Sequence, residues 1–328
     1  MQSWPDIFSK FKDLNILIIG DVMIDAYIWG AVERISPEAP VPIISVKKRD
    51  FRLGGAANVA LNVLSLGAKP VLCALAGQDV QGNRLLQLMG AKGMSTEGIV
   101  VSTTRPTTVK ARVIAAHQHV IRIDDESDAM ATSQEEQELL NRIQKLLPDC
   151  QAVIFEDYDK GAITKKVIEE TVKLAKSLGV PTIVDPKKRN FLQYRNVTLF
   201  KPNLKELREG LKMEIEADNT ASVNEAVEQV KGRLGVEGVI LTLSERGVYI
   251  DFQKQQLIVP AHKREIADVS GAGDTVVSIA ALCVALGLGS EKIATLSNLG
   301  GGLVCQYVGV VPIDREELLA EAMKLELH

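Results

Sequence analysis

Asn15-Ile-Leu-Ile-Ile-Gly20, followed directly by Asp21, is the stretch that decides the fold class. A short, continuous apolar run that ends at Gly-Asp is typical of a strand buried on both faces of a parallel sheet. Amphipathic helical segments separate it from similar apolar runs at residues 70–76, 151–155, 181–184, 197–200 and 239–243. Strands that alternate with helices predict an α/β fold with three layers, in which helices cover both faces of a mostly parallel central sheet.

Two stretches break this alternation, at residues of about 26–48 and 105–124. The second places Val109, Ala111 and Val113 alternately with Lys110 and Arg112, which is the pattern of antiparallel strands with one solvated face. The simpler interpretation is an extension of the main sheet. We favour a small separate β-sheet that forms a lid, because neither stretch resembles a buried parallel strand.

The composition of the chain argues against several classes of function. The chain has 328 residues, a formal net charge of −4 and only 4% aromatic residues, so neither a nucleic-acid surface nor a membrane patch is expected. No low-complexity linker divides it, and we expect a single domain over residues 1–328. The four cysteines are far apart in sequence, and residues 1–13 do not resemble a signal peptide. These features predict a cytoplasmic protein.

The strongest chemical motif is Asp268-Val-Ser-Gly-Ala-Gly-Asp274, which precedes an apolar helix. The amides of Gly271, Ala272 and Gly273 can form an anion cradle at the helix start. Asp274 could accept a proton from a hydroxyl nucleophile, so the motif supplies a base and an electrostatic clamp for phosphoryl transfer. Taken alone, the stretch is equally explained as an ordinary helix start with a favourable first-turn acid.

A second motif, Gly54-Gly55-Ala-Ala-Asn58-Val-Ala60, opens an earlier helix. The glycines permit close approach of a ligand, and the Asn58 amide can hold a hydroxyl; tight packing with a local cap is the alternative. No Lys-Ser/Thr follows the glycines, so this is not a Walker loop. The chain also lacks a Gly-x-Gly-x-x-Gly fingerprint after a strand, which disfavours a nicotinamide oxidoreductase.

Further candidates lie near the predicted strand ends. Asp21 and Asp25 could grip sugar hydroxyls, although Asp21 could simply cap a turn. Glu206, three residues after Asn203, could hold hydrated Mg²⁺, although a solvated helix-start acid is the commoner role of such a residue. Lys187 lies in a basic turn suited to a substrate phosphate or merely to solvent. Gln118 is a better ligand candidate than its flanking histidines, and Thr242, Ser244 and Gly247 form a turn that could line a nucleotide.

Together these motifs resemble the ribokinase-like carbohydrate kinases of the phosphofructokinase-B group. The resemblance covers nearly the whole chain and rests on GGAANVA (54–60), DYDKG (157–161), KPNLKE (201–206) and DVSGAGD (268–274). It implies an ATP-dependent and Mg²⁺-dependent sugar kinase with a ribokinase-like fold and a β lid, often shared across a homodimer.

The resemblance also implies roles for individual residues. Asp274 would be the base that activates the anomeric hydroxyl, and the 271–273 amides would form the anion hole. The sugar would be held by Asp21, Asp25, Gly54, Gly55, Asn58 and Gln118. Asp157 and Lys160 would lie near the sugar and its phosphate, and Lys187 would meet a 7-phosphate. Asn203 and Glu206 would manage Mg²⁺ and the ATP phosphates, while Thr242, Ser244 and Gly247 would line the nucleotide.

Within the group, GDVMIDAYIWG (20–30), RISPEAPVP (34–42), residues 105–124 and VDPKKRNF (184–191) look like the D-glycero-β-D-manno-heptose 7-phosphate kinases of ADP-heptose and lipopolysaccharide core synthesis. The alternatives are a kinase of fructose, ribose or fructose 6-phosphate, or a non-catalytic sugar sensor on the same scaffold. Many members of the group have two threonines in the motif that reads DVSGAGD here. Their absence leaves the use of a monovalent cation open. No nucleotidyltransferase motif follows, so a separate protein is expected to carry out adenylylation.

Overall fold

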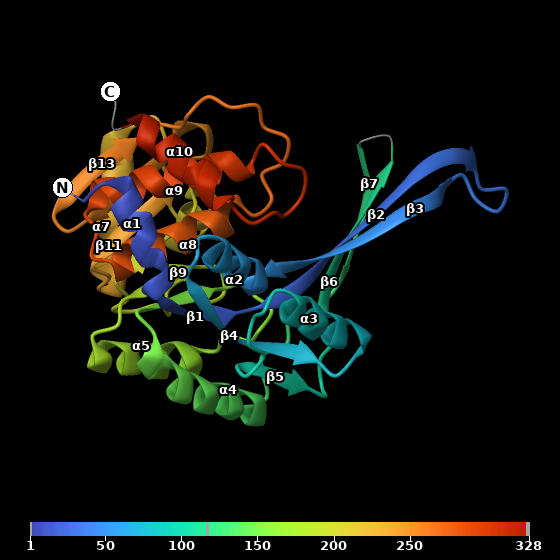
Figure 1. Ribbon diagram of the computed structural model, residues 1–328, viewed down its shortest axis with the longest axis horizontal. Coiled ribbons are helices and arrows are strands. Elements are labelled where there is room, and N and C mark those ends of the chain that lie inside the picture. The colour runs from blue at the N-terminus through green and yellow to red at the C-terminus, as the bar shows by residue number, and fades with distance from the viewer. Residues whose placement is uncertain (1, 116–117, 326–328) are drawn as a thin grey trace.

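The computed structural model describes residues 2–115 and 118–325. Its central feature is a nine-stranded, mostly parallel sheet (Figure 1), in which only β12 runs antiparallel to its neighbours. The strands follow the order β13 (Gln255–Val259), β12 (Val248–Phe252), β11 (Gly238–Thr242), β10 (Leu199–Phe200), β9 (Thr182–Asp185), β8 (Ala152–Glu156), β1 (Asn15–Gly20), β4 (Lys69–Gly77) and β5 (Ile99–Ser102).

Helices cover both faces of this sheet, as the alternation of strands and helices predicts. Alternate strand residues reach opposite layers: Ile16 and Ile18 of β1 join one hydrophobic core, and Leu17 and Ile19 join the other. The first core lies beneath α1 (Trp4–Lys10), α2 (Ala56–Ser65), α3 (Val80–Ala91), α8 (Ala272–Ala285), α9 (Ser290–Val304) and α10 (Arg315–Leu325). The second lies beneath α4 (Ser133–Leu146), α5 (Lys165–Leu178), α6 (Leu204–Leu211) and α7 (Thr220–Leu234).

A second, four-stranded sheet projects from the body as an arm (Figure 1). Its order is β3 (Pro42–Gly55), β2 (Val22–Ile35), β6 (Thr108–Ala115) and β7 (Gln118–Asp125). The prediction of a small separate sheet from two chain segments is therefore confirmed, and extension of the main sheet is wrong. Residues 116 and 117 of the expected second segment lie outside the described residues.

Some elements were not predicted. These are β5, β13, α1 and α10, all at the margins of the fold. Their sequences are short or only partly apolar, so periodicity is a weak signal there. Within residues 2–115 and 118–325, no helix combines the length and apolar character needed to cross a membrane.

Candidate active site

The order in which the chain adds strands to the sheet reverses between β1 and β8. From β1 it proceeds to β4 and β5 on one side, whereas β8, β9 and β10 follow on the other. Ligands of open α/β sheets bind beyond the carboxyl ends of strands at such a switch point. Here those ends carry Asp21, Glu156, Asp185 and Lys201, and α8 begins above them.

Asp274 lies in the first turn of α8 and is almost completely buried. Two donors fix its carboxylate: Asn58 Nδ2 lies 2.7 Å from Oδ2, and the Tyr158 hydroxyl lies 2.8 Å from Oδ1. Burial raises the pKa of Asp274, whereas these two hydrogen bonds oppose the rise. Asn58 and Asp274 are 216 residues apart in sequence, so the fold joins the two glycine-rich motifs in one site.

The small residues before Asp274 shape the start of α8. Gly271 is the N-cap with a left-handed φ of 84°, which favours glycine. A Cβ atom on Gly273 would lie 3.2 Å from Lys201 Nζ and 3.4 Å from Asp185 Oδ2. The first N–H groups of a helix have no acceptor within it, and that of Ala272 instead contacts the Val269 carbonyl at 3.3 Å. The helix start thus combines amide dipoles with a lysine, as an anion site requires.

Asn203 and Glu206 form a capping box at the start of α6. Glu206 Oε2 accepts the Asn203 N–H at 2.9 Å, and Oε1 accepts Lys187 Nζ at 2.5 Å. Each oxygen thus accepts one hydrogen bond and keeps a further lone pair, and the contact of Glu206 with Mg²⁺ stays a prediction. Lys187 Nζ also lies 3.5 Å from Asp185 Oδ1. Its contact with a substrate phosphate stays a prediction.

Asp21 and Asp157 shape the loop that carries Tyr158. Asp21 accepts the backbone N–H groups of Tyr158, Lys160 and Ala162 at 2.9–3.0 Å. Burial raises its pKa to about 6. Asp157 is buried and accepts hydrogen bonds from Asn190 and Tyr194. Both aspartates thus hold the loop that carries Tyr158. Their contacts with the sugar stay a prediction.

Asp25 connects the site to the lid. Its carboxylate pairs with Arg112 of β6, and both side chains are largely buried. Gly54 permits this arrangement, because a Cβ there would lie 2.1 Å from Asp25 Oδ2. Gly55, with φ of 59°, begins the turn into α2 that carries Asn58.

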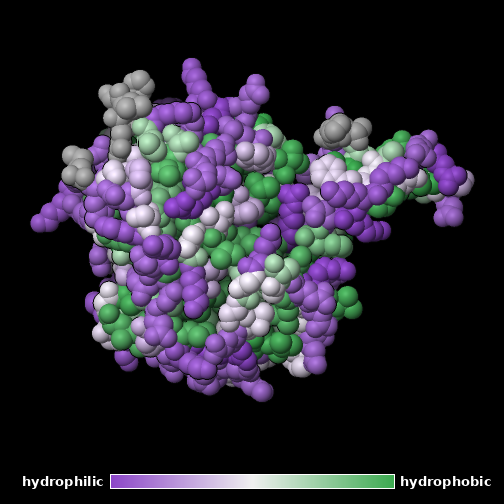
Figure 2. All heavy atoms as spheres, in the orientation of Figure 1, coloured by the Kyte–Doolittle hydropathy of each residue, from purple (hydrophilic) through white to green (hydrophobic). Residues whose placement is uncertain are grey.

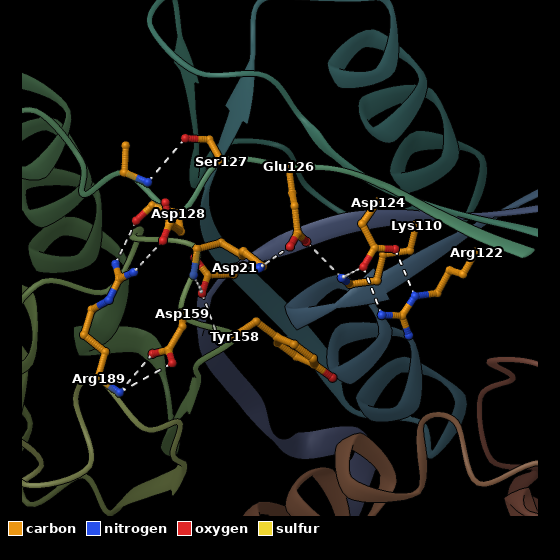
Figure 3. A network of polar contacts seen from close by, with 12 residues as sticks. Asp21, Lys110, Arg122, Asp124, Glu126, Ser127, Asp128, Tyr158, Asp159 and Arg189 are labelled. Atoms are coloured by element: carbon orange, nitrogen blue, oxygen red, sulfur yellow. Dashed lines mark hydrogen bonds and ion pairs between the residues drawn. The ribbon is translucent and has the colours of Figure 1, made fainter.

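Charged side chains also join the lid to the loop after β8 (Figure 3). Glu126 accepts Lys160 Nζ at 2.6 Å and Lys110 Nζ at 2.9 Å. Lys160 therefore lies in this network at the base of the lid. Gln118 begins β7 beside the tip of the lid hairpin, and its exposed side chain is not among the buried site residues.

The expected nucleotide residues adjoin this centre. A β-bridge pairs Thr242 with Asn203, so the turn after β11 lies beside the start of α6. Ser244 and Gly247 have positive φ values of 55° and 95° and shape the turn between β11 and β12.

Sequence reasoning missed four side chains of the centre: Glu156, Tyr158, Asp185 and Lys201. Each belongs to or adjoins a motif that was recognised, DYDKG, VDPKKRNF or KPNLKE. The available signal was the alternation of side chains along a strand, in which every second residue points to the same face of the sheet. Glu156, Asp185 and Lys201 follow Ile154, Ile183 and Leu199 by two residues, and these three apolar residues all lie in the core beneath α8.

A carboxylate held beside a glycine-rich helix start, under a β lid, defines a phosphotransferase site of the sugar-kinase type. The model of the pfkB family carbohydrate kinases matches residues 13–316, and the chain therefore belongs to that family.

The solved structures support the same fold. Phosphofructokinase-2 from Escherichia coli in complex with potassium has a TM-score of 0.79 at 17% identity, covering 95% of this chain and 99% of that one. Arabidopsis thaliana ribokinase complexed with ribose and ATP has a TM-score of 0.71 at 18% identity, covering 93% of this chain and 98% of that one. The ribokinase-like fold prediction is thus confirmed.

The sequence relatives are more similar to this chain than these solved structures are. The protein named bifunctional protein HldE from Desulfatibacillum aliphaticivorans is 38% identical over 95% of this chain, and that from Wolinella succinogenes is 40% identical over 92%. This chain spans only 64% and 63% of their respective lengths.

Proposed function

We propose that this chain transfers the γ-phosphoryl group of ATP to the anomeric hydroxyl of D-glycero-β-D-manno-heptose 7-phosphate, giving the 1,7-bisphosphate. The observation that carries the kinase chemistry is the position of Asp274. Its carboxylate is buried, oriented by Asn58 and Tyr158, and lies one residue after the Gly273 amide. A base and an anion-binding helix start are thereby placed next to each other.

In this mechanism Asp274 takes the proton of the C1 hydroxyl, and that oxygen attacks the γ-phosphorus in line. The bond between the γ-phosphorus and the β–γ bridging oxygen breaks, and ADP is the leaving group. The helix-start amides and Lys201, whose ammonium lies beside Gly273, stabilise the negative charge that develops on the migrating group. Mg²⁺, when bound with ATP, would neutralise charge on the phosphate oxygens. Asn58 and Tyr158 hold the carboxylate in place, and closure of the lid would exclude water.

Two lines of support favour the heptose substrate over another sugar. The stretches at residues 20–30, 34–42 and 184–191 look like those of the heptose 7-phosphate kinases. Proteins named bifunctional protein HldE match this chain at 38–40% identity, above the 17–18% of the phosphofructokinase and ribokinase structures. On this proposal the enzyme works in the cytoplasm on the route to ADP-heptose and lipopolysaccharide core.

The test is ADP release with a panel of heptose 7-phosphate, fructose 6-phosphate, fructose and ribose. We expect the highest kcat/KM for the heptose phosphate. Asp274→Asn should lower kcat by about 10²–10⁴-fold, the usual contribution of a general base, without losing ATP binding. Near-normal turnover of this variant would refute Asp274 as the base, whereas a preference for another sugar would refute only the substrate.

A further inference from the structure

A basic hollow lies outside the active site, between α5 and the segment that leads into β10. We call it the α5 hollow. Its volume is about 590 Å³, within the usual range for sites that bind small molecules. One wall is the face of α5 between Lys165 and Lys176, and the other is formed by Gln193, Arg195 and Asn196. This helix lies at the edge of the body away from the projecting arm (Figure 1).

The α5 hollow combines an apolar floor with a cationic rim. Ile168 and Val172, which line it, are buried in the core. Lys173 and Lys176 belong to the same helix and are three residues apart, so their side chains are neighbours on its surface. Arg195 belongs to the opposite wall. The hollow can therefore contact an apolar and an anionic part of one ligand.

Most cations of this rim lack an acidic partner. Lys165 lies 3.6 Å from Glu169, the one acid that lines the α5 hollow. Within the part of the chain that the structure describes, Lys173, Lys176 and Arg195 have no carboxylate within ion-pair distance. Three positive charges thus surround one hollow in a chain whose formal net charge is −4. The overall composition does not account for this local excess.

The α5 hollow is separate from the active site. It adjoins a second hollow of about 300 Å³, with which it shares Lys176, and Pro181 and Thr182 line that second hollow where β9 begins. Asp185, at the other end of β9, lies in the active site beside Lys201. Glu237 lines the second hollow and would repel an anion, which favours the α5 hollow as the place for a negatively charged group.

We propose that the α5 hollow binds a small molecule through a diphosphate group. Arginine and lysine side chains bind phosphate oxygens by charge-assisted hydrogen bonds, and three cations without acidic partners match the several negative charges of a diphosphate. The organic part of the ligand would lie on Ile168 and Val172. None of these residues takes part in the phosphoryl transfer proposed above, so the site does not depend on which sugar is the substrate.

The test uses inorganic pyrophosphate and uridine diphosphate as probes, each titrated into the full chain by isothermal calorimetry without Mg²⁺. The variants are Lys173→Gln/Lys176→Gln and Arg195→Gln, all at exposed positions. Lys12→Gln/Lys92→Gln is the matched control, because it removes two exposed lysines elsewhere on the surface. The helix start in the active site also favours anions, so the comparison between variants assigns the site.

We expect both probes to bind the wild type, and the dissociation constant to rise about tenfold in each variant of the α5 hollow, as the loss of a charge-assisted hydrogen bond predicts. The control should bind as the wild type does. Uridine diphosphate should bind more tightly than pyrophosphate, because its nucleoside contacts the apolar floor; equal affinities would identify free diphosphate as the ligand. Dissociation constants that are the same in the wild type and both variants of the α5 hollow, or no binding by the wild type, would overturn the proposal.

Discussion

At the scale of single residues, Tyr158 connects the parts of the site. Its backbone N–H donates to Asp21 at 2.9 Å, and its hydroxyl donates to Asp274 at 2.8 Å. The ammonium of Lys187 lies 5.4 Å from the centre of its ring. One backbone contact and two side-chain contacts thus fix Tyr158, whose hydroxyl in turn orients the proposed base. Tyr158 is a positioning residue in this mechanism.

Replacing Tyr158 by Phe should alter the pH dependence of the reaction. The hydroxyl donates to the ionised form of Asp274, so its loss should raise a pKa that burial has already raised. Asp274 must be deprotonated to act as a base. The acidic limb of the kcat/KM profile should therefore move to higher pH, while the rate on the plateau above it changes less. Steady-state ADP release between pH 5 and pH 9 measures the limb.

Tyr249→Phe is the matched control for this measurement. The Tyr249 hydroxyl is buried on β12 and has no hydrogen-bond partner within the part of the chain that the structure describes. Its removal should leave the profile unchanged. An acidic limb at the same pH in Tyr158→Phe and wild type would contradict the role assigned to Tyr158.

Some residues of the site could be predicted from the sequence, and others could not. Asn58 and Asp274 could be predicted, because each lies in a glycine-rich motif at the start of a helix and the fold joins them. Lys187 and Glu206 were each predicted to meet a ligand, yet they pair with one another. Sequence spacing cannot reveal such a pair, because the two residues belong to separate loops that meet only in the folded sheet.

At the scale of elements, the lid depends on how β2 and β3 leave the body. The first lid stretch, at about 26–48, was predicted because it does not resemble a buried parallel strand, and the alternation of apolar and charged residues supported the second, at 105–124. Their attachment could not be predicted. It depends on the buried pair of Asp25 and Arg112, and on Gly54, which leaves room for the Asp25 carboxylate.

Gly54→Ala should therefore destabilise the protein. The new methyl group would overlap Asp25 Oδ2 and displace it from Arg112, and overpacking of this kind costs about 1–3 kcal/mol. Urea unfolding measures the change. Gly90→Ala in α3 is the control, because open space surrounds that position and alanine favours a helix by about 0.5–1 kcal/mol. A Gly54→Ala protein as stable as the wild type would show that Asp25 relaxes without loss.

At the scale of the whole molecule, the arm exposes more large apolar side chains than we expect of a lid that contacts no partner. Figure 2 shows hydrophobic side chains along it among polar ones. Large apolar side chains at least 40% exposed include Val32, Val46, Ile121 and Ile123, on three of its four strands. Register places Ile121 and Ile123 on the lid face opposite Asp25 and Arg112. Exposed apolar area of this kind is typical of a protein interface.

We therefore expect two copies to associate through their lids, and Ile121→Lys to separate them. Light scattering after size exclusion should give the wild type twice the mass of its 35.7 kDa chain and the variant the mass of one chain. Ile121 is 54% exposed, so a lysine there introduces charge into the interface without unfolding the lid. Val101→Lys, at a 49% exposed position on β5 away from the arm, should remain dimeric. A wild-type protein of single-chain mass at all concentrations would exclude the lid interface.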